Sequence, residues 1–203
     1  MIKNIVFDLG QVLVNFNPME YLKPFGFKDE TNQMLVEKIF KSKEWLECDS
    51  GTYRNNSDLA DLLIDKYPQL KNEIRLVLNK DWVKMLSLKQ ETVDYLKQLK
   101  KQSFKIYILS NLSEESYNYV KNYEFFEKID GGIYSYELKV CKPNPQIYLE
   151  LFSKYKIIPE ETIFIDDNRE NIEMSEKLGM HGVVFYDLED TKQKVDNIIQ
   201  AQK

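Results

Sequence analysis

The sequence is poor in the residues that most often build zinc sites and nucleophilic triads. It contains one histidine, His181, and two cysteines, Cys48 and Cys141, which stand far apart in the chain. A structural zinc site needs about four Cys or His ligands, so this set cannot form a Cys/His zinc cluster. A Ser-His-Asp triad would depend on the single histidine. We therefore expect carboxylates to carry any chemistry, since the chain has 33 Asp and Glu residues.

Long apolar segments are also missing from the sequence. No apolar run approaches the roughly 18 residues that mark a membrane-spanning helix, and residues 1–10 lack the pattern of a signal peptide. The formal net charge of −5 argues against a general nucleic-acid-binding surface. We expect a cytoplasmic protein with reduced thiols and with no membrane or nucleic-acid partner. The sequence does not indicate the oligomeric state.

Short apolar runs, each followed by polar residues, are what the sequence does contain. With 43% hydrophobic residues among 203, the chain can bury a substantial core. The runs predict buried strands, and helical spacing of apolar residues lies between them. This alternation predicts a parallel sheet covered by helices on both faces, which is a three-layer Rossmann-like α/β core. The four runs are residues 5–7, 106–109, 163–165 and 183–185.

The stretch from residue 15 to residue 85 differs, because it contains no comparable apolar run. Its apolar residues follow helical spacing, and Ser57 is predicted to cap a helix that ends at Pro68. We interpret residues 15–85 as an inserted α-helical cap, and residues 1–14 and 86–203 as the α/β hydrolase core. Further helices are predicted at residues 91–101, 145–155, 171–178 and 190–203, with Gly179 as the C-cap of the third.

Polar residues at the ends of the predicted strands indicate phosphoryl-transfer chemistry. Asp8 follows the first run, Ser110–Asn111 the second and Asp166–Asp167 the third, and Lys142 lies in a proline-rich loop. Ligands of parallel α/β sheets bind at the carboxyl ends of the strands. There a carboxylate can attack phosphorus to form an acyl-phosphate, and two further acids can hold Mg²⁺. A hydroxyl, an amide and an ammonium group can meet the remaining phosphoryl oxygens.

Four ordered segments carry these residues, namely Phe7–Val14, Leu109–Asn111, Cys141–Pro143 and Phe164–Asn171. They resemble the four motifs of the haloacid-dehalogenase-like hydrolase superfamily. The resemblance spans nearly the whole chain, and the helical insertion lies where the helical-cap subgroup carries its cap. It is closest to the small bacterial sugar-phosphate phosphatases of the α-glucose-1-phosphate phosphatase type. It implies a Mg²⁺-dependent phosphatase that acts on a small-molecule phosphate ester through an aspartyl-phosphate intermediate.

The resemblance also implies a role for each residue at the metal. Asp8 is the nucleophile and a Mg²⁺ ligand, and the backbone carbonyl of Gly10 is a second ligand. Asp167 is the third, while Asp166 binds the metal directly or through water. This acidic pair favours phosphoryl transfer, because true haloacid dehalogenases lack it and use no Mg²⁺.

On the phosphate side, the resemblance implies that Ser110, Asn111 and Lys142 grip the phosphate. Lys142 would also neutralise the charge of Asp8. Taken singly, each of these residues has an ordinary structural alternative. Ser110 and Asn111 can form a turn, and the acids near residue 166 can cap the following helix.

Gly10 departs from the family pattern, because the usual phosphatase has a second Asp at this position as general acid and base. General acid–base catalysis contributes typically about 10²–10⁴-fold. A substrate with a good leaving group, such as a hexose 1-phosphate, would offset this loss at the leaving-group step. The sequence indicates no residue that would activate water for hydrolysis of the aspartyl-phosphate.

Two alternative functions remain open at this point. A phosphomutase would return the phosphoryl group to a sugar, but Gly10 leaves it without the usual base. A non-catalytic phosphate-binding protein would not need the nucleophile, yet Asp8 is present. In the predicted cap, Asp49, Tyr53 and Arg54 are candidates for substrate contact, and His181 is interpreted as structural or solvent-facing.

Overall fold

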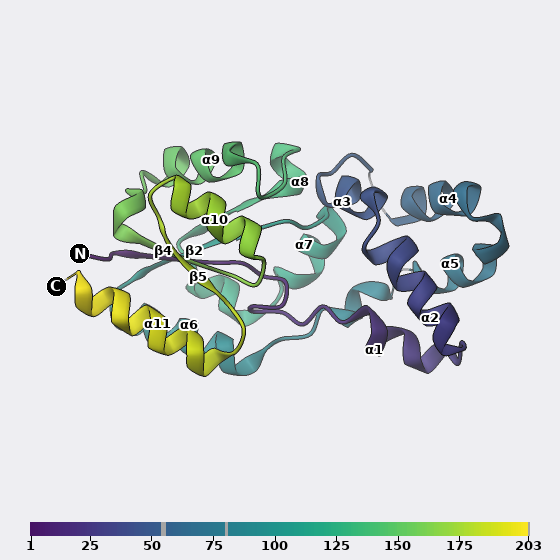
Figure 1. The fold of residues 1–203 in the computed structure, drawn as a ribbon, viewed down its shortest axis with the longest axis horizontal. Coiled ribbons are helices and arrows are strands. Elements are labelled where there is room, and N and C mark those ends of the chain that lie inside the picture. The colour runs from purple at the N-terminus through teal and green to yellow at the C-terminus, as the bar shows by residue number, and fades with distance from the viewer. Residues whose placement is uncertain (54–55, 80, 203) are drawn as a thin grey trace.

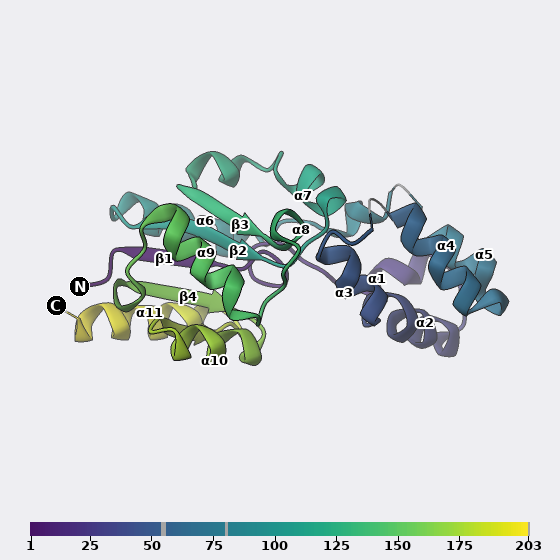
Figure 2. The same ribbon diagram turned by 90° about the horizontal axis from the view of Figure 1, so that it is seen from above.

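The computed structural model describes residues 1–53, 56–79 and 81–202. A five-stranded parallel sheet lies between helices, and a further group of helices lies beyond the carboxyl ends of the strands (Figures 1 and 2). The strand order is β3-β2-β1-β4-β5, so the direction of the strand order reverses at β1. The predicted Rossmann-like α/β fold is therefore confirmed. The strands are β1 Asn4–Phe7, β2 Lys105–Ser110, β3 Gly131–Tyr134, β4 Thr162–Asp166 and β5 His181–Val184.

The helices of the sheet-bearing part form two layers. Helices α6 and α11 cover one face and α9 and α10 the other (Figure 1). Successive residues of β1 show why, because Ile5 and Phe7 belong to one buried cluster and Val6 to the other. The helices are α6 Gln90–Lys101, α7 Glu114–Val120, α8 Ser135–Leu138, α9 Pro145–Tyr155, α10 Arg169–Lys177 and α11 Leu188–Ala201.

The described residues between 15 and 85 form helices and no strand. The α-helices are α1 Pro18–Leu22, α2 Asp29–Leu35, α3 Lys43–Asp49, α4 Asn56–Lys66 and α5 Lys71–Val77. Fully buried residues such as Trp82, Leu35 and Leu63 belong to the same cluster as one face of the sheet. The apolar interior is thus continuous from the sheet into these helices.

The two segments that lead into and out of these helices lie side by side. Val14 and Leu88 form an antiparallel bridge. The backbone N–H of Asn15 donates to Ser87 O at 2.7 Å, and that of Lys89 donates to Leu13 O at 2.9 Å. Both connections therefore cross at one place, next to the loop that follows β1.

Several local predictions needed correction. Strand β3 was not predicted, because its Gly131–Gly132 start interrupts the apolar run that marks the other strands. The last strand was predicted at residues 183–185, but β5 begins at His181 and ends at Val184. Ser57 does not cap α4, because the helix begins one residue earlier at Asn56 and Ser57 lies inside it.

The helix ends elsewhere agree with the sequence. Helix α4 ends just before Pro68, which begins a 3₁₀ turn. Gly179 directly follows the C-cap Leu178 of α10 with a φ of +94°. Among the described residues, no helix is long and apolar enough to cross a membrane.

Candidate active site

Lys142 is the centre of a buried cluster of charges at the carboxyl ends of β1 and β4. Its Nζ donates to Asp8 Oδ1 at 2.8 Å, to Asp166 Oδ2 at 2.6 Å and to the carbonyl of Leu109 at 2.8 Å. Lys142 is only 4% exposed, and Asp166 is fully buried. All three protons of the ammonium group are thus committed, and the lysine joins the ends of three strands.

Asp166 is held rigidly on its other side. Asn171 Nδ2 donates to both of its carboxylate oxygens at 3.0 Å, and the backbone N–H of Asn168 donates to Oδ1 at 2.8 Å. Asn168 also caps α10, because its side chain accepts a hydrogen bond from the N–H of Glu170. The cap of this helix is therefore supplied by Asn168, which leaves Asp167 for other partners.

Asp8, Asp166 and Asp167 each place a carboxylate oxygen within 4.8 Å of the others. Asp8 and Asp166 are buried and Asp167 is exposed. Three converging carboxylates with one open side suit a hard cation that keeps water or a phosphate oxygen in its shell. The donor set therefore fits Mg²⁺.

Burial and neighbouring charges act in opposite directions on the pKa values of Asp8 and Lys142. Burial raises the pKa of the Asp8 carboxyl, and the charges of Asp166 and Asp167 raise it further, while Lys142 lowers it. Burial by itself would lower the pKa of Lys142, but Asp166 and Asp8 raise it, so that the lysine stays charged. An uncompensated negative charge at this position favours a cation beside Asp8.

Asn111 is committed to the loop that carries Lys142. Its Nδ2 donates to the carbonyl of Lys142 at 3.0 Å, and its Oδ1 accepts from the N–H of Lys142 at 2.7 Å. The Asn111 side chain therefore fixes the backbone of the lysine. Ser110, at the end of β2, lines an adjacent cavity with Gly10. Gly10 has room beside it, since a Cβ atom there would lie 3.8 Å from Asp8 Oδ2.

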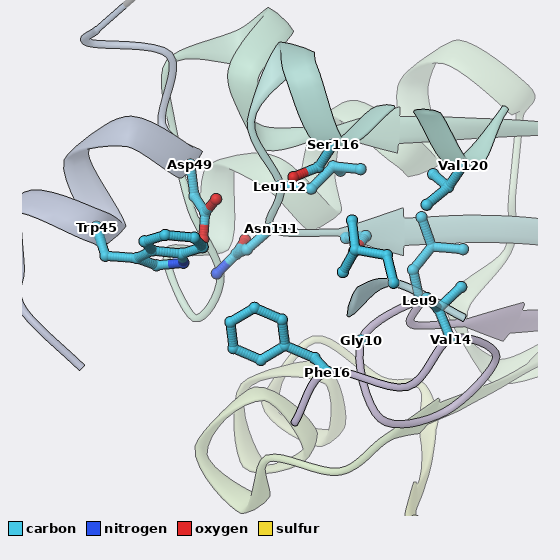
Figure 3. A pocket seen from close by; sticks show the side chains of 12 residues that line it. Leu9, Gly10, Val14, Phe16, Trp45, Asp49, Asn111, Leu112, Ser116 and Val120 are labelled. Atoms are coloured by element: carbon cyan, nitrogen blue, oxygen red, sulfur yellow. The ribbon is translucent and has the colours of Figure 1, made fainter. Parts of the chain in front are cut away.

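Two neighbouring cavities lie beside the cluster. The first, of about 310 Å³, is open and is lined by Asp8, Lys142 and Asp167 among others. The second, of about 120 Å³, is largely apolar and extends between the helices of residues 15–85 and the sheet (Figure 3). Both are lined by the same five residues, which are Gly10, Phe16, Trp45, Asp49 and Asn111.

The structure brings the predicted residues of the strand ends and Lys142, from the loop before α9, to one place. Asp8, Asn111, Lys142 and Asp167 line the open space, and Gly10 lines both spaces. The hydrogen bonds from Asn171 to Asp166 were not predicted. The position of Asn171 in the first turn of α10 is a signal that its side chain can reach back to the strand end.

Of the three residues of the helical segment that were predicted to contact substrate, one lines the cavities. Asp49 lines both spaces, whereas the hydroxyl of Tyr53 donates to Glu47 Oε2 at 2.8 Å. Arg54 lies outside the described residues. His181 is in β5 and is partly exposed, and its Nε2 lies 3.1 Å from the carbonyl oxygen of Glu160.

Fold and cluster together define an α/β protein with a buried aspartate directly after its first strand. The sequence matches the family described as haloacid dehalogenase-like hydrolase over residues 2–179. The chain therefore belongs to the haloacid dehalogenase-like hydrolases and is an enzyme.

Two curated relatives of the chain are named as phosphatases. It is 27% identical over 194 residues to a D-ribitol-5-phosphate phosphatase from Bacteroides thetaiotaomicron, covering 88% of this chain and 89% of that protein. It is 23% identical over 192 residues to a sesquiterpene phosphatase from Aspergillus oryzae, covering 91% of this chain and 90% of that protein.

Solved structures show the same fold. An enzyme of this family from Bacteroides thetaiotaomicron, in complex with magnesium and inorganic phosphate, superposes with a TM-score of 0.70 at 27% identity, covering 91% of this chain and 94% of that one. A predicted hydrolase of the family from Porphyromonas gingivalis gives 0.72 at 22% identity, covering 98% of each chain.

Proposed function

We propose that this chain is a Mg²⁺-dependent phosphomonoester hydrolase that acts through an aspartyl-phosphate on Asp8. The observation that carries this proposal is the buried cluster in which Lys142 contacts both Asp8 and Asp166 beside the exposed Asp167. An ammonium group between two buried carboxylates is well placed for a dianionic phosphoryl group. The complex of a related enzyme with magnesium and phosphate supports the same chemistry.

Each residue of the cluster has a role in this mechanism. Asp8 attacks phosphorus, and Lys142 lowers the charge repulsion between the carboxylate and the phosphate. Ser110, Asn111 and Lys142 bind the phosphoryl oxygens, and for this Lys142 turns the proton that it donates to Asp8 toward the phosphate. The two hydrogen bonds between the Asn111 side chain and the Lys142 backbone hold the lysine in position. Because Lys142 is fixed by three acceptors, little reorganisation is needed as charge develops.

Asp8, Asp167, Asp166 and the backbone carbonyl of Gly10 would hold Mg²⁺. When bound, the ion stabilises negative charge on the phosphoryl oxygens. Asp166 already accepts hydrogen bonds from Lys142 and Asn171. Asp167, the exposed member of the set, would therefore bind the ion directly, and Asp166 would bind it directly or through water.

Residues 15–85 act in this proposal as a helical cap over the core formed by residues 1–14 and 86–203. The paired connections at Val14 and Leu88 support this division, because both chain crossings lie at one point. A cap next to the site excludes water and contacts the part of the substrate that differs between esters. Cys48 and Cys141 both remain thiols, which fits the proposed cytoplasmic location.

For the substrate we propose a small phosphorylated metabolite, with a sugar phosphate such as a hexose 1-phosphate as the first candidate. Gly10 supplies no carboxylate, and an anomeric phosphate has a good leaving group. The related ribitol-phosphate phosphatase supports a polyol or sugar phosphate.

The second cavity favours another substrate class. Seven apolar side chains line it, which are Leu9, Val14, Phe16, Trp45, Leu86, Leu112 and Val120. Such a lining suits the phosphate ester of an apolar alcohol better than that of a sugar. The related sesquiterpene phosphatase points the same way.

Hydrolysis of an aryl phosphate with and without Mg²⁺ tests the reaction, with Asp8→Asn beside the unmodified protein. We expect turnover that is lost with EDTA and in the variant. Activity that survives both would refute the mechanism. A panel of hexose 1-phosphates, hexose 6-phosphates and a prenyl phosphate then tests the substrate, and faster turnover of the 6-phosphates would contradict the leaving-group argument.

A further inference from the structure

Hydrolysis through an acyl-phosphate requires two proton transfers. The departing alkoxide must gain a proton in the first step, and the attacking water must lose one in the second. At Gly10 there is no side chain to serve either step. A group that supplies both must face the same space as Asp8.

The titratable side chains that line the two cavities are few within the described residues. They are Asp8, Asp49, Lys142 and Asp167. In the proposed mechanism Asp8 is the nucleophile and Asp167 holds the metal. Lys142 donates its three protons to Asp8, Asp166 and Leu109. Asp49 is the carboxylate that remains.

Asp49 lies where a leaving group would be. It is the last residue of α3, and its side chain projects beside the Trp45 ring toward Asn111, across from Phe16 and Gly10 (Figure 3). An in-line attack by Asp8 places the leaving oxygen on the side of phosphorus away from the nucleophile. The proposed cap, which carries Asp49, approaches from outside the sheet and therefore faces that side.

The end of α3 is fastened to the core. Ser135 Oγ donates to the carbonyl of Asp49 at 2.6 Å and accepts from the N–H of Leu112 at 2.9 Å. Lys139 Nζ donates to the carbonyl of Gly51. The backbone of Asp49 is thus tied to the loop after β2, which follows the phosphate-binding residues of the proposed mechanism.

We propose that Asp49 is the general acid and base of this enzyme, supplied from the helical segment in place of the side chain that Gly10 lacks. The proposal rests on the phosphomonoesterase function proposed above, but it replaces the leaving-group argument for hexose 1-phosphates, because an acid at Asp49 also serves esters with poor leaving groups. In the first step Asp8 forms a bond to phosphorus, the bond from phosphorus to the leaving oxygen breaks, and that oxygen takes the proton of Asp49. In the second step Asp49 takes a proton from water, the water oxygen bonds to phosphorus, and the bond to Asp8 breaks.

The surroundings of Asp49 suit both proton transfers. Burial raises the pKa of its carboxyl to about 7, and the charge of Asp8 also raises it, while hydrogen bonds from the backbone of Ser113 and the side chain of Trp45 oppose the rise. A group with a pKa near the working pH is present in both forms. Asp49→Asn has nearly the same shape and keeps one oxygen to accept from Ser113 or Trp45, but it cannot transfer a proton.

The test compares an aryl phosphate, whose leaving oxygen is stable as an anion, with the fastest alkyl phosphate in the panel. In the Mg²⁺-loaded Asp49→Asn variant we expect kcat/KM for the alkyl ester to fall by about 100-fold or more, and that for the aryl ester by less than about 10-fold. Rapid-quench measurement should show a burst of aryl alcohol approaching one equivalent, because the phosphoenzyme then waits for an unactivated water. Asp65→Asn, an exposed acid on α4, is the charge-matched control and should behave as the unmodified protein.

Each outcome decides the matter. Equal losses for the two esters without a burst would show a structural role and overturn the proposal. So would an unchanged variant, or an unmodified enzyme that hydrolyses aryl but no alkyl esters. An unmodified enzyme without activity on any ester would overturn the proposed function, and this inference with it.

Discussion

Lys142→Met is the most informative single substitution for the buried cluster. Methionine keeps a side chain of similar length but removes the ammonium group from between Asp8 and Asp166, which lie 2.8 and 2.6 Å away. Both carboxylates are nearly or fully buried. The substitution therefore leaves buried negative charge without its partner.

Removing one partner of a buried ion pair costs about 3–5 kcal/mol, because the remaining charge stays desolvated. For a chain of this size that corresponds to a fall in Tm of roughly 6–20 °C. The loss depends on pH. Burial already raises the pKa of Asp8, and the variant lacks the lysine that lowers it. The folded variant therefore binds a proton that the unfolded chain releases, so its stability declines as pH rises above the ordinary carboxyl range.

Urea unfolding of the metal-free proteins at about pH 5 and about pH 7.5 measures both effects. We expect the larger difference between the variant and the unmodified protein at the higher pH. Lys177→Met, an exposed lysine at the end of α10, is the matched control and should cost less than about 0.5 kcal/mol. A loss below about 1 kcal/mol for Lys142→Met, or an equal loss at both pH values, would refute the buried-charge argument.

The remaining predictions concern the metal, Gly10 and Asp49. Mg²⁺ at about 100 times its Kd should raise the unfolding free energy by about 2.7 kcal/mol, which thermal unfolding detects as a higher Tm. Asp167→Asn should abolish this rise in Tm. An unchanged rise would exclude Asp167 as a ligand. Gly10→Asp in the Asp49→Asn background should recover at least about 10-fold of the lost alkyl-ester turnover, since a Cβ atom at this position meets nothing closer than Asp8 Oδ2 at 3.8 Å. Without metal, the raised pKa of Asp49, about 7 against its ordinary 3.8, means that the folded state holds a proton which the unfolded chain has lost. Stability should thus fall between about pH 4 and pH 7 by at most about 4 kcal/mol, and unfolding curves of Asp49→Asn that run parallel to those of the unmodified protein would contradict this.

The strand ends of the core were predictable because each combines a buried apolar run with a polar residue at a fixed place. Asp8 and Asp166 follow such runs, so their convergence at one edge of a parallel sheet follows from topology alone. Lys142 is not at a strand end. Its position was available only from the resemblance to a family, since nothing in its local sequence indicates that its side chain reaches two carboxylates.

The predicted strand set was incomplete where local signals fail. Gly131 and Gly132 begin β3 and contribute no apolar side chains, although Ile133 and Tyr134 are buried. Local sequence patterns also do not predict which residue of the helical segment reaches the site. Asp49 ends a seven-residue helix and is separated from Asp8 by about half of that segment, so its approach to the site depends on how α3 packs against α8.

Placing the acid on the helical segment makes proton transfer depend on docking of α3, and Gly51 offers a way to test this without changing any proposed catalytic group. Gly51 has a φ of +69°, and a Cβ atom there would lie 2.6 Å from the carbonyl oxygen of Tyr136. Gly51→Ala should therefore separate the end of α3 from α8. We expect the pattern of Asp49→Asn, with alkyl-ester turnover falling by about 10-fold or more and aryl-ester turnover less affected.

Gly26→Ala is the matched control, because Gly26 also has a positive φ, of +71°, but meets no atom within 4 Å. It carries the same backbone strain at a distance from α8 and should leave the ratio of the two activities unchanged. If Gly51→Ala lowers both activities equally, docking of α3 serves binding or folding, and proton transfer does not depend on it. A selective loss of alkyl-ester turnover links the contact between α3 and α8 to the protonation of the leaving group.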